Sequence, residues 1–436
     1  MKRDRIIRWI VALTFVMSAG FAFYHQIRPS VDASAYDQVG WNIAQGHGFR
    51  LTLDVPIEED EVITYQGPLY QYFVGGIYGV FGHSYQAVWM MQALLRAMTA
   101  YLLYLICLKL FGEKERRIGW IAAAFFGFYP DLVEVGAMLM TETLFIFLSV
   151  LVVWLFVRQF EKPTVQASAW LGLAFGLGIL SRSSILLFGL AFAVWYWRKR
   201  ALLPFITFCF IGGLVLVPWT VRNALVYHQF IPTMANAGYN MWVGNREGGT
   251  GEGGNPPTLP AYQKEYGMTG ANTFFAGRFR SFVIAHPDQY AAFSLGRFVK
   301  YFSVIRPLGF WFYQSGLPQL LQVAGSAVAS IFLFGFGFAG LWMSWRDKNE
   351  ALKFISAFVA LTAFPVIMII ISTRYRLPIY PLMGILGSYA VVRFGSDMKR
   401  YMPVVAGSFV FVFALALIDG AQSIQKVWSH INSFLS

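Results

Sequence analysis

Charged residues and cysteines are both scarce in this chain. Only 13% of its 436 residues are charged and 57% are hydrophobic, whereas a soluble domain carries about 25% charged residues. This balance excludes an ordinary soluble domain. Both cysteines, Cys107 and Cys209, fall inside apolar runs, so the sequence predicts packed thiols, with no disulfide framework and no metal-binding spacing.

Signatures of nucleotide binding and of nucleophilic catalysis are also lacking. The glycine-rich stretch 244–257 does not end in the Gly-Lys-Ser/Thr of a phosphate loop and follows no parallel-sheet strand. We expect it to be a flexible loop that covers a substrate. None of the six histidines has ligand spacing, and none pairs with a serine or cysteine in a nucleophile arrangement.

Long apolar runs are what the chain has in abundance, and basic clusters separate them. Many runs exceed the roughly 18 residues that mark a candidate membrane span. The net charge of +12 is therefore assigned to topology, because lysine and arginine favour the cytoplasmic ends of spans, and no nucleic-acid partner is predicted. The clusters are Lys2/Arg3/Arg5/Arg8, Lys109/Lys114/Arg116/Arg117, Arg158/Lys162, Arg198/Lys199/Arg200, Arg346/Lys348/Lys353 and Arg393/Lys399/Arg400. With these inside, we predict eleven spans, at residues 7–24, 86–108, 118–134, 142–157, 168–181, 184–197, 201–220, 318–344, 352–371, 377–393 and 402–418.

One segment leaves the count open between eleven and thirteen. Residues 67–82 are apolar but short, and counting them as a span would place the Lys109 cluster outside. We predict that they form an interfacial or re-entrant helix on the outer side. The N-terminal apolar run fits a signal peptide or an uncleaved anchor, and its length favours the anchor. The long connections 25–66 and 221–317 are then both extracytoplasmic.

Polar residues at the outer ends of these spans form the candidate site. Arginines in short outer turns oppose the positive-inside rule, so Arg182, Arg374 and Arg376 need another explanation. Asp32 and Tyr36 are four residues apart and share a face if they lie on a helix. The predicted site residues are Asp32, Tyr36, Asp37, Glu142, Arg182, Arg222, Asn223, Arg374, Tyr375 and Arg376.

Sugar transfer from a polyprenyl-phosphate carrier suits this set of side chains. The departing phosphate must be stabilised, and arginine does so with a planar fork of donors. The acceptor hydroxyl must lose a proton, which a carboxylate within hydrogen-bond reach can take. No nucleotide site is required, because the sugar arrives on the lipid. A divalent cation held by Asp32 and Glu142 is an open alternative that nothing in the sequence demands.

Each residue also has an ordinary structural interpretation. Asp32 fits the N-cap of a juxtamembrane helix, and Glu142 fits a partner for a helix N-terminus. Arg374 and Arg376 could snorkel to lipid head groups. Trp219 suits the aromatic belt or packing better than sugar stacking.

The order and spacing of several short motifs resemble the GT-C membrane glycosyltransferases, close to the protein O-mannosyltransferase-like group and the lipid A aminoarabinose transferases. The motifs are Asp32-x-x-x-Tyr36, Trp41 to Phe49, Gly67-Pro-Leu-Tyr70, Met140 to Phe145, Gly178 to Ser183, Pro218 to Asn223, Gly238 to Asn245 and Arg374 to Pro381.

The resemblance implies a helical bundle with juxtamembrane helices in its first outer loop. It maps the catalytic base candidate to Asp32 and the second acidic position to Glu142, and it points to Arg222 and Arg374 as contacts for the lipid phosphate. The chain departs from the pattern in two places. Ala33 follows Asp32 where O-mannosyltransferases carry Asp-Glu, and Gln66 stands where some relatives carry lysine.

The resulting prediction is an all-α, GT-C-type hexosyl- or pentosyltransferase of the bacterial inner membrane with an extracytoplasmic active site. Its partners would be a polyprenyl-phosphate-sugar donor, a lipid, glycan or protein acceptor, and membrane lipids. Residues 1–220 would form the catalytic module with a first outer loop at 25–85, residues 221–317 an extracytoplasmic loop, and residues 318–436 C-terminal helices.

Within that module we expect Asp32 to act as base and Tyr36 to position it. Glu142 would bind the acceptor or orient the nucleophile. Direct displacement would invert the anomeric centre, because no second carboxylate is placed as a nucleophile. The alternative is a transporter or flippase of lipid-linked sugars, a class that places ionisable groups near the membrane midplane.

Overall fold

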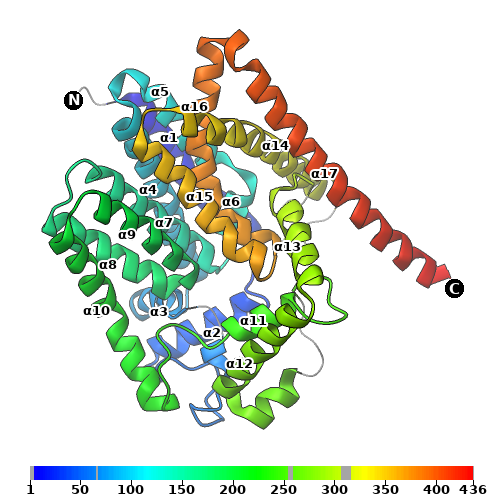
Figure 1. The fold of residues 1–436 in the computed structure, drawn as a ribbon. Coiled ribbons are helices and arrows are strands. Elements are labelled where there is room, and N and C mark those ends of the chain that lie inside the picture. The colour runs from blue at the N-terminus through cyan, green and yellow to red at the C-terminus, as the bar shows by residue number, and fades with distance from the viewer. Residues whose placement is uncertain (1–3, 65–66, 254–258, 306–315, 436) are drawn as a thin grey trace.

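The computed structural model describes residues 4–64, 67–253, 259–305 and 316–435. In these ranges the chain is a bundle of helices (Figure 1), and the only β pairing is an isolated parallel bridge between Glu252 and Ile371. The first half contains α1 (Arg5–His25), α2 (Asp32–Ala44), α3 (Leu69–Phe81), α4 (Tyr85–Phe111), α5 (Arg116–Phe128), α6 (Pro130–Gly136), α7 (Thr141–Arg158), α8 (Val165–Ser181), α9 (Phe188–Arg198) and α10 (Leu202–Tyr227). The second half contains α11 (Ala237–Gly244), α12 (Leu259–Ala285), α13 (Pro287–Phe302), α14 (Gly316–Arg346), α15 (Glu350–Met368), α16 (Tyr380–Ser396) and α17 (Met398–Leu435). Short 3-10 helices lie at η1 (Glu61–Thr64), η2 (Glu113–Glu115), η3 (Ser183–Leu187) and η5 (Thr373–Ile379).

Each of the eleven predicted spans falls on a helix or a helix pair. Among the described residues, eight helices are long and apolar enough to cross a membrane, or nine if the pair Glu113–Phe128 and Pro130–Gly136, bent by 55°, is one span. The other two predicted spans correspond to the shorter apolar helices Val165–Ser181 and Ser183–Arg198. A helix needs about 20 residues to cross a hydrocarbon core. The predicted eleven to thirteen spans therefore outnumber the described helices that are long enough to cross.

A buried arginine stabilises the break between α5 and α6. Arg96 of α4 is 2% exposed, and its guanidinium donates to the carbonyl of Gly127 at 3.1 Å and to Ser18. The last carbonyls of a helix have no partner within it, so the cation satisfies the end of α5. The spans therefore do carry a charge away from their ends, and its contacts are structural.

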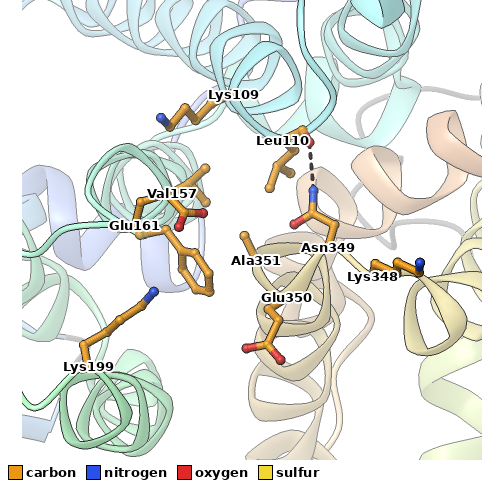
Figure 2. A pocket seen from close by; sticks show the side chains of 10 residues that line it. Lys109, Leu110, Val157, Glu161, Lys199, Lys348, Asn349, Glu350 and Ala351 are labelled. Atoms are coloured by element: carbon orange, nitrogen blue, oxygen red, sulfur yellow. Dashed lines mark hydrogen bonds between the residues drawn. The ribbon is translucent and has the colours of Figure 1, made fainter.

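Members of four of the basic clusters lie at one end of the bundle, which we call the basic end and define by Lys109, Lys199 and Lys348. There the amide of Asn349 donates to the carbonyl of Leu110 at 2.8 Å, beside a cavity of about 370 Å³ (Figure 2). Lys109, Lys199 and Lys348 all line this cavity. The same end holds ion pairs between Arg393 and Glu115 at 3.4 Å and between Arg198 and Glu350 at 3.7 Å. Clusters far apart in sequence thus share one end, as the alternating topology predicts.

The opposite end carries the short helices α2, α3 and α11, together with the longer, kinked α12 (lower part of Figure 1). The helix expected within 67–82 is present as α3, which at 13 residues is about 20 Å long and too short to cross. Of the glycine-rich stretch 244–257, only residues up to 253 are described, and residues 254–257 lie outside the described ranges.

Candidate active site

Two carboxylates and two guanidiniums from four separate elements meet near the α2 end of the bundle. Asp32 is the first residue of α2, Glu142 lies in the first turn of α7, Arg182 follows α8, and Arg374 lies in η5. Arg182 Nη2 lies 2.6 Å from Glu142 Oε1. Arg374 Nη2 hydrogen-bonds Asp32 Oδ2, and its Nε lies 3.9 Å from Glu142 Oε1. The structure therefore joins Asp32 and Glu142 through one shared arginine, Arg374.

Burial separates the roles that these two carboxylates can take. The side chain of Glu142 is 0% exposed and that of Arg182 is 8% exposed, whereas Asp32 is 29% exposed. The carboxylate of Asp32 is therefore partly open to solvent, while that of Glu142 is enclosed and contacts Arg182 and Arg374. The cluster has two charges of each sign, which lowers the cost of burying them.

The capping interpretation of Asp32 does not match the structure. The N-cap residue of α2 is Val31, and the helix has no side-chain cap. The Asp32 carboxylate instead reaches Arg374, which is 342 positions away in sequence. Glu142 does occupy the first turn of α7, where an anion is favoured, and it binds Arg182 from there.

Thr141 and Tyr375 hold the two guanidiniums in place. Arg182 Nε donates to Thr141 Oγ1 at 3.0 Å. The ring of Tyr375 lies 5.7 Å from the Arg182 guanidinium and 5.5 Å from that of Arg374. Aromatic faces attract cations at this distance, so Tyr375 contributes to the site as a platform for both arginines.

Tyr36 lies one helical turn after Asp32 and is 1% exposed. Burial, and secondarily the charge of Asp32, raises the pKa of its phenol far above the usual value. Tyr36 therefore stays neutral and cannot serve as the base at ordinary pH. Its ring packs edge-on against Tyr70, with centroids 5.6 Å apart.

Gln92 is a residue of this region that the sequence did not single out. It accepts a hydrogen bond from the hydroxyl of Tyr70 at 2.9 Å and donates to the carbonyls of Gly136 and Met138 at 3.0 and 2.8 Å. It thus links α3 to the turn that leads into Glu142. A glutamine in the middle of an apolar run was the available signal, and polar residues in spans commonly act this way.

The Gly67-Pro-Leu-Tyr70 motif has a steric explanation. A Cβ atom at Gly67 would collide with the carbonyl oxygen of Leu180. Only glycine allows the outer loop to lie directly against the end of α8, two residues before Arg182. Gln66, the departure noted in the sequence, lies outside the described residues.

Asp37 lies apart from the carboxylate cluster. It accepts hydrogen bonds from the hydroxyls of Tyr78 at 2.6 Å and Tyr85 at 2.8 Å, and His83 Nε2 lies 2.8 Å from Oδ1. Burial, together with the hydrogen bond to Asp37, raises the pKa of the Tyr78 phenol. Asp37 thus fastens α2 to α3 and the start of α4.

Arg222 and Asn223 also lie outside the cluster. The Arg222 guanidinium sits 5.2, 5.3 and 5.9 Å from the rings of Trp219, Tyr227 and Phe49, and it donates to the Phe49 carbonyl at 3.3 Å. Asn223 is fully buried and donates to the carbonyl of Ile231 at 2.8 Å. Both hold loop backbone against α10.

Arg376 is two residues from Arg374 but points into a different network. It is 1% exposed, and it donates to the carbonyl of Ser303 at 2.6 Å. Its guanidinium lies 5.9 Å from the ring of Tyr380, whose hydroxyl donates to Asp131 at 3.4 Å. This depth of burial rules out snorkelling to head groups as its role.

The residues as placed do not form a metal site between the two acidic side chains. The guanidinium of Arg374 lies between Asp32 and Glu142 and contacts both. Across the part of the chain that the structure describes, no group of three or more His, Cys, Asp or Glu side chains is placed to hold a metal ion.

A helical bundle of this arrangement has been seen before. The apo oligosaccharyltransferase of Archaeoglobus fulgidus superposes with a TM-score of 0.55, covering 97% of this chain at 13% identity. The fold is GT-C-like. The same species' AglB, in complex with an inhibitory peptide and a dolichol-phosphate, gives 0.52 over 96% of this chain at 15% identity. This chain spans only 56% of the length of either solved chain.

Part of this chain also matches a known sequence family. Residues 65–221 match the family model described as dolichyl-phosphate-mannose-protein mannosyltransferase, which confirms the resemblance carried by the motifs. ArnT from Cupriavidus metallidurans, bound to undecaprenyl phosphate, covers 90% of this chain and 79% of its own at 16% identity, but its TM-score of 0.42 is too low to argue a common fold. No curated protein sequence matches the chain significantly.

Proposed function

We propose that this protein is a glycosyltransferase that moves a sugar from a polyprenyl-phosphate carrier to a hydroxyl acceptor. The single observation that carries the proposal is the Asp32–Arg374–Glu142–Arg182 cluster, in which a partly exposed carboxylate lies beside the partly buried guanidinium of Arg374 and the buried one of Arg182. The family model that matches residues 65–221 names a lipid-phosphate sugar donor, and one solved relative in fold holds a dolichol-phosphate. Both support a donor of this class.

In the proposed reaction the acceptor oxygen attacks the anomeric carbon of the donor sugar. The bond between that carbon and the phosphate oxygen breaks, and its electron pair leaves with the polyprenyl phosphate. Asp32 takes the hydroxyl proton as general base. A single displacement of this kind inverts the anomeric centre.

Arg374 is the proposed contact for the departing phosphate. A guanidinium has five N–H donors, so Arg374 can keep a bond to Asp32 while it donates to a phosphate oxygen. Arg182 adds positive charge behind it. Because Glu142 is fully enclosed, we assign it the orientation of both arginines rather than contact with the acceptor, and Tyr36 the support of Asp32.

Asp37, Arg222, Asn223 and Arg376 are proposed to hold the frame of this site rather than to touch the substrate, since each is engaged by backbone or aromatic groups outside the cluster. No step of the proposal passes through a metal ion.

The proposal places the site on the extracytoplasmic face of a bacterial inner membrane, because the basic end defined by Lys109, Lys199 and Lys348 would face the cytoplasm. Residues 1–220 would then supply Asp32, Glu142 and Arg182 of the catalytic module, residues 221–317 the outer segment, and the C-terminal residues 318–436 would add Arg374 of η5. The acceptor is a lipid, glycan or protein hydroxyl, and the sugar a hexose or pentose.

The test is transfer from a synthetic polyprenyl-phosphate sugar by purified Asp32→Asn protein. Loss of a general base lowers turnover by about 100-fold or more, with the amide keeping the shape of the side chain. Asp54→Asn is the matched control, because Asp54 is an exposed aspartate of the same outer loop. Asp32→Asn activity within a few-fold of wild type would remove Asp32 from the role of base. Translocation of the intact lipid-linked sugar with no glycosidic product would favour the flippase instead.

A further inference from the structure

Arg297 of α13 is a buried arginine that the proposed reaction does not use. It is 1% exposed, and burial lowers its pKa to about 10, which leaves it protonated at neutral pH. All three guanidinium nitrogens donate hydrogen bonds. The acceptors are the carbonyls of Ile367 at 2.6 Å, Gly244 at 2.9 Å, Met368 at 3.2 Å and Gly251 at 3.3 Å, with Asn245 Oδ1 at 2.9 Å and Ser294 Oγ at 3.1 Å.

Two of these acceptors terminate α15. Ile367 and Met368 are the last residues of that helix, and such carbonyls have no partner within the helix. A cation is favoured at a helix C-terminus. Arg297 therefore fixes the point at which α15 ends and the chain turns toward the site.

Residues 369–371, which follow α15, are bonded to residues 245–252 of the outer segment. Asn245 Nδ2 donates to the carbonyl of Ile369 at 2.9 Å. Glu252 forms the parallel bridge with Ile371, and its carboxylate lies 2.5 Å from Lys300 Nζ. The Gly238 to Asn245 motif thus ends on a buried asparagine that contacts both Arg297 and this stretch of chain.

Residues 369–372 lead directly into η5, which begins at Thr373 and carries Arg374 as its second residue. Arg374 is the residue that spans Asp32 and Glu142. A displacement of about 1 Å in a positioning contact can cost on the order of 100-fold in rate. The position of Arg374 therefore depends on where residues 369–372 are held.

We propose that Arg297 is a positioning residue for the donor-phosphate contact: it ties the outer segment at 244–252 to the end of α15 and so sets the place of Arg374. This inference rests on the proposed function. It also assigns the glycine-rich stretch, as far as residue 253, to holding the site rather than to a loose cover.

The experiment measures the donor KM and the dissociation constant for synthetic polyprenyl phosphate, both with purified Arg297→Gln protein. Both constants should rise about tenfold, which is the scale of one charge-assisted hydrogen bond lost between a displaced Arg374 and the phosphate. Arg297→Lys should lose nearly as much, because an ammonium cannot reproduce the forked set of donors. Arg280→Gln, an exposed arginine of α12, is the matched control and should leave both constants unchanged.

A merely structural role would lower the fraction of active protein and leave the donor KM as it was, which would overturn the proposal. Combining Arg297→Gln with Arg374→Gln sharpens this test, because residues that act through one another are not additive. The double variant should bind polyprenyl phosphate no more weakly than Arg374→Gln alone. Full additivity would also overturn the proposal.

Amide hydrogen exchange separates this inference from the proposed function. Residues 369–379 should exchange faster in Arg297→Gln and Arg297→Lys than in wild type, with Arg280→Gln unchanged. This readout needs no transfer activity. If wild-type protein shows no transfer but residues 369–379 exchange faster in the Arg297 variants, only the glycosyltransferase proposal is contradicted. If exchange in the Arg297 variants matches wild type, the positioning role of Arg297 is contradicted.

Discussion

Arg374 and Arg222 carried the same prediction from sequence, yet they lie in two very different surroundings. Arg374 lies between two carboxylates, Asp32 and Glu142. Arg222 lies among three aromatic rings and donates to a backbone carbonyl. An arginine that binds carboxylates can also donate hydrogen bonds to an incoming phosphate, because carboxylate and phosphate are both anionic acceptors that fit the guanidinium fork. An arginine held by rings and backbone instead stabilises its loop.

The region with the carboxylates should be the more sensitive to substitution, and Glu142→Gln should have the largest effect. Removing this charge leaves Arg182 buried with no anion at its Nη2. Breaking a buried ion pair costs about 3–5 kcal/mol of stability, and transfer should be lost with it. Thermal unfolding of purified protein measures the first effect and a transfer assay the second. Wild-type stability would show that Glu142 does not neutralise the cluster.

Arg374→Lys should come next. The charge remains but the planar fork is lost, so Asp32 and a phosphate oxygen can no longer be held together. We expect kcat/KM for the polyprenyl-phosphate sugar to fall by about 100-fold, the range seen when one preorganised donor to a developing anion is removed. Arg346→Lys, at the end of α14, is a control. Equal activity of Arg374→Lys and wild type would contradict the proposal that Arg374 binds Asp32 and the phosphate at the same time.

Arg222→Gln should have the smallest effect of the three. Loss of the contacts to Trp219, Tyr227 and Phe49 should cost about 1 kcal/mol of stability, and the donor KM should stay within about twofold of wild type. Steady-state kinetics over a range of donor concentrations tests this. A tenfold rise in donor KM would return Arg222 to the phosphate contacts and erase the contrast with Arg374.

Part of the architecture was readable from the sequence because it is local. Apolar length and basic clusters placed a helix at every predicted span, and α3 was expected from the short run at 67–82. The count of spans was less secure, since α8 and the η3–α9 pair are apolar but short. Apolar runs of this length are compatible with either a span or a buried helix.

The side chains that form the site were mostly named in advance, whereas their partners were not. Asp32, Glu142, Arg182 and Arg374 stood out because charge at the outer end of a span is costly without a reason. Charge and position did not separate Arg374 from Arg376, and only the family resemblance pointed to Arg374. In the structure Arg374 enters the carboxylate cluster, whereas Arg376 donates to Ser303. Their directions depend on the 3-10 geometry of η5, which no pattern in the sequence predicted.

The sequence alone determined that this is a polytopic helical membrane protein with acidic and basic residues gathered at one set of span ends, because hydropathy and charge act over short distances along the chain. Only the tertiary structure decided which of those charges meet. An ion pair such as Arg374 with Asp32 joins residues 342 positions apart, and the packing of α2, α7, α8 and η5 brings them within reach. The same packing gave Gln92 and Arg297 their roles, because a buried donor takes its function from the carbonyls that surround it.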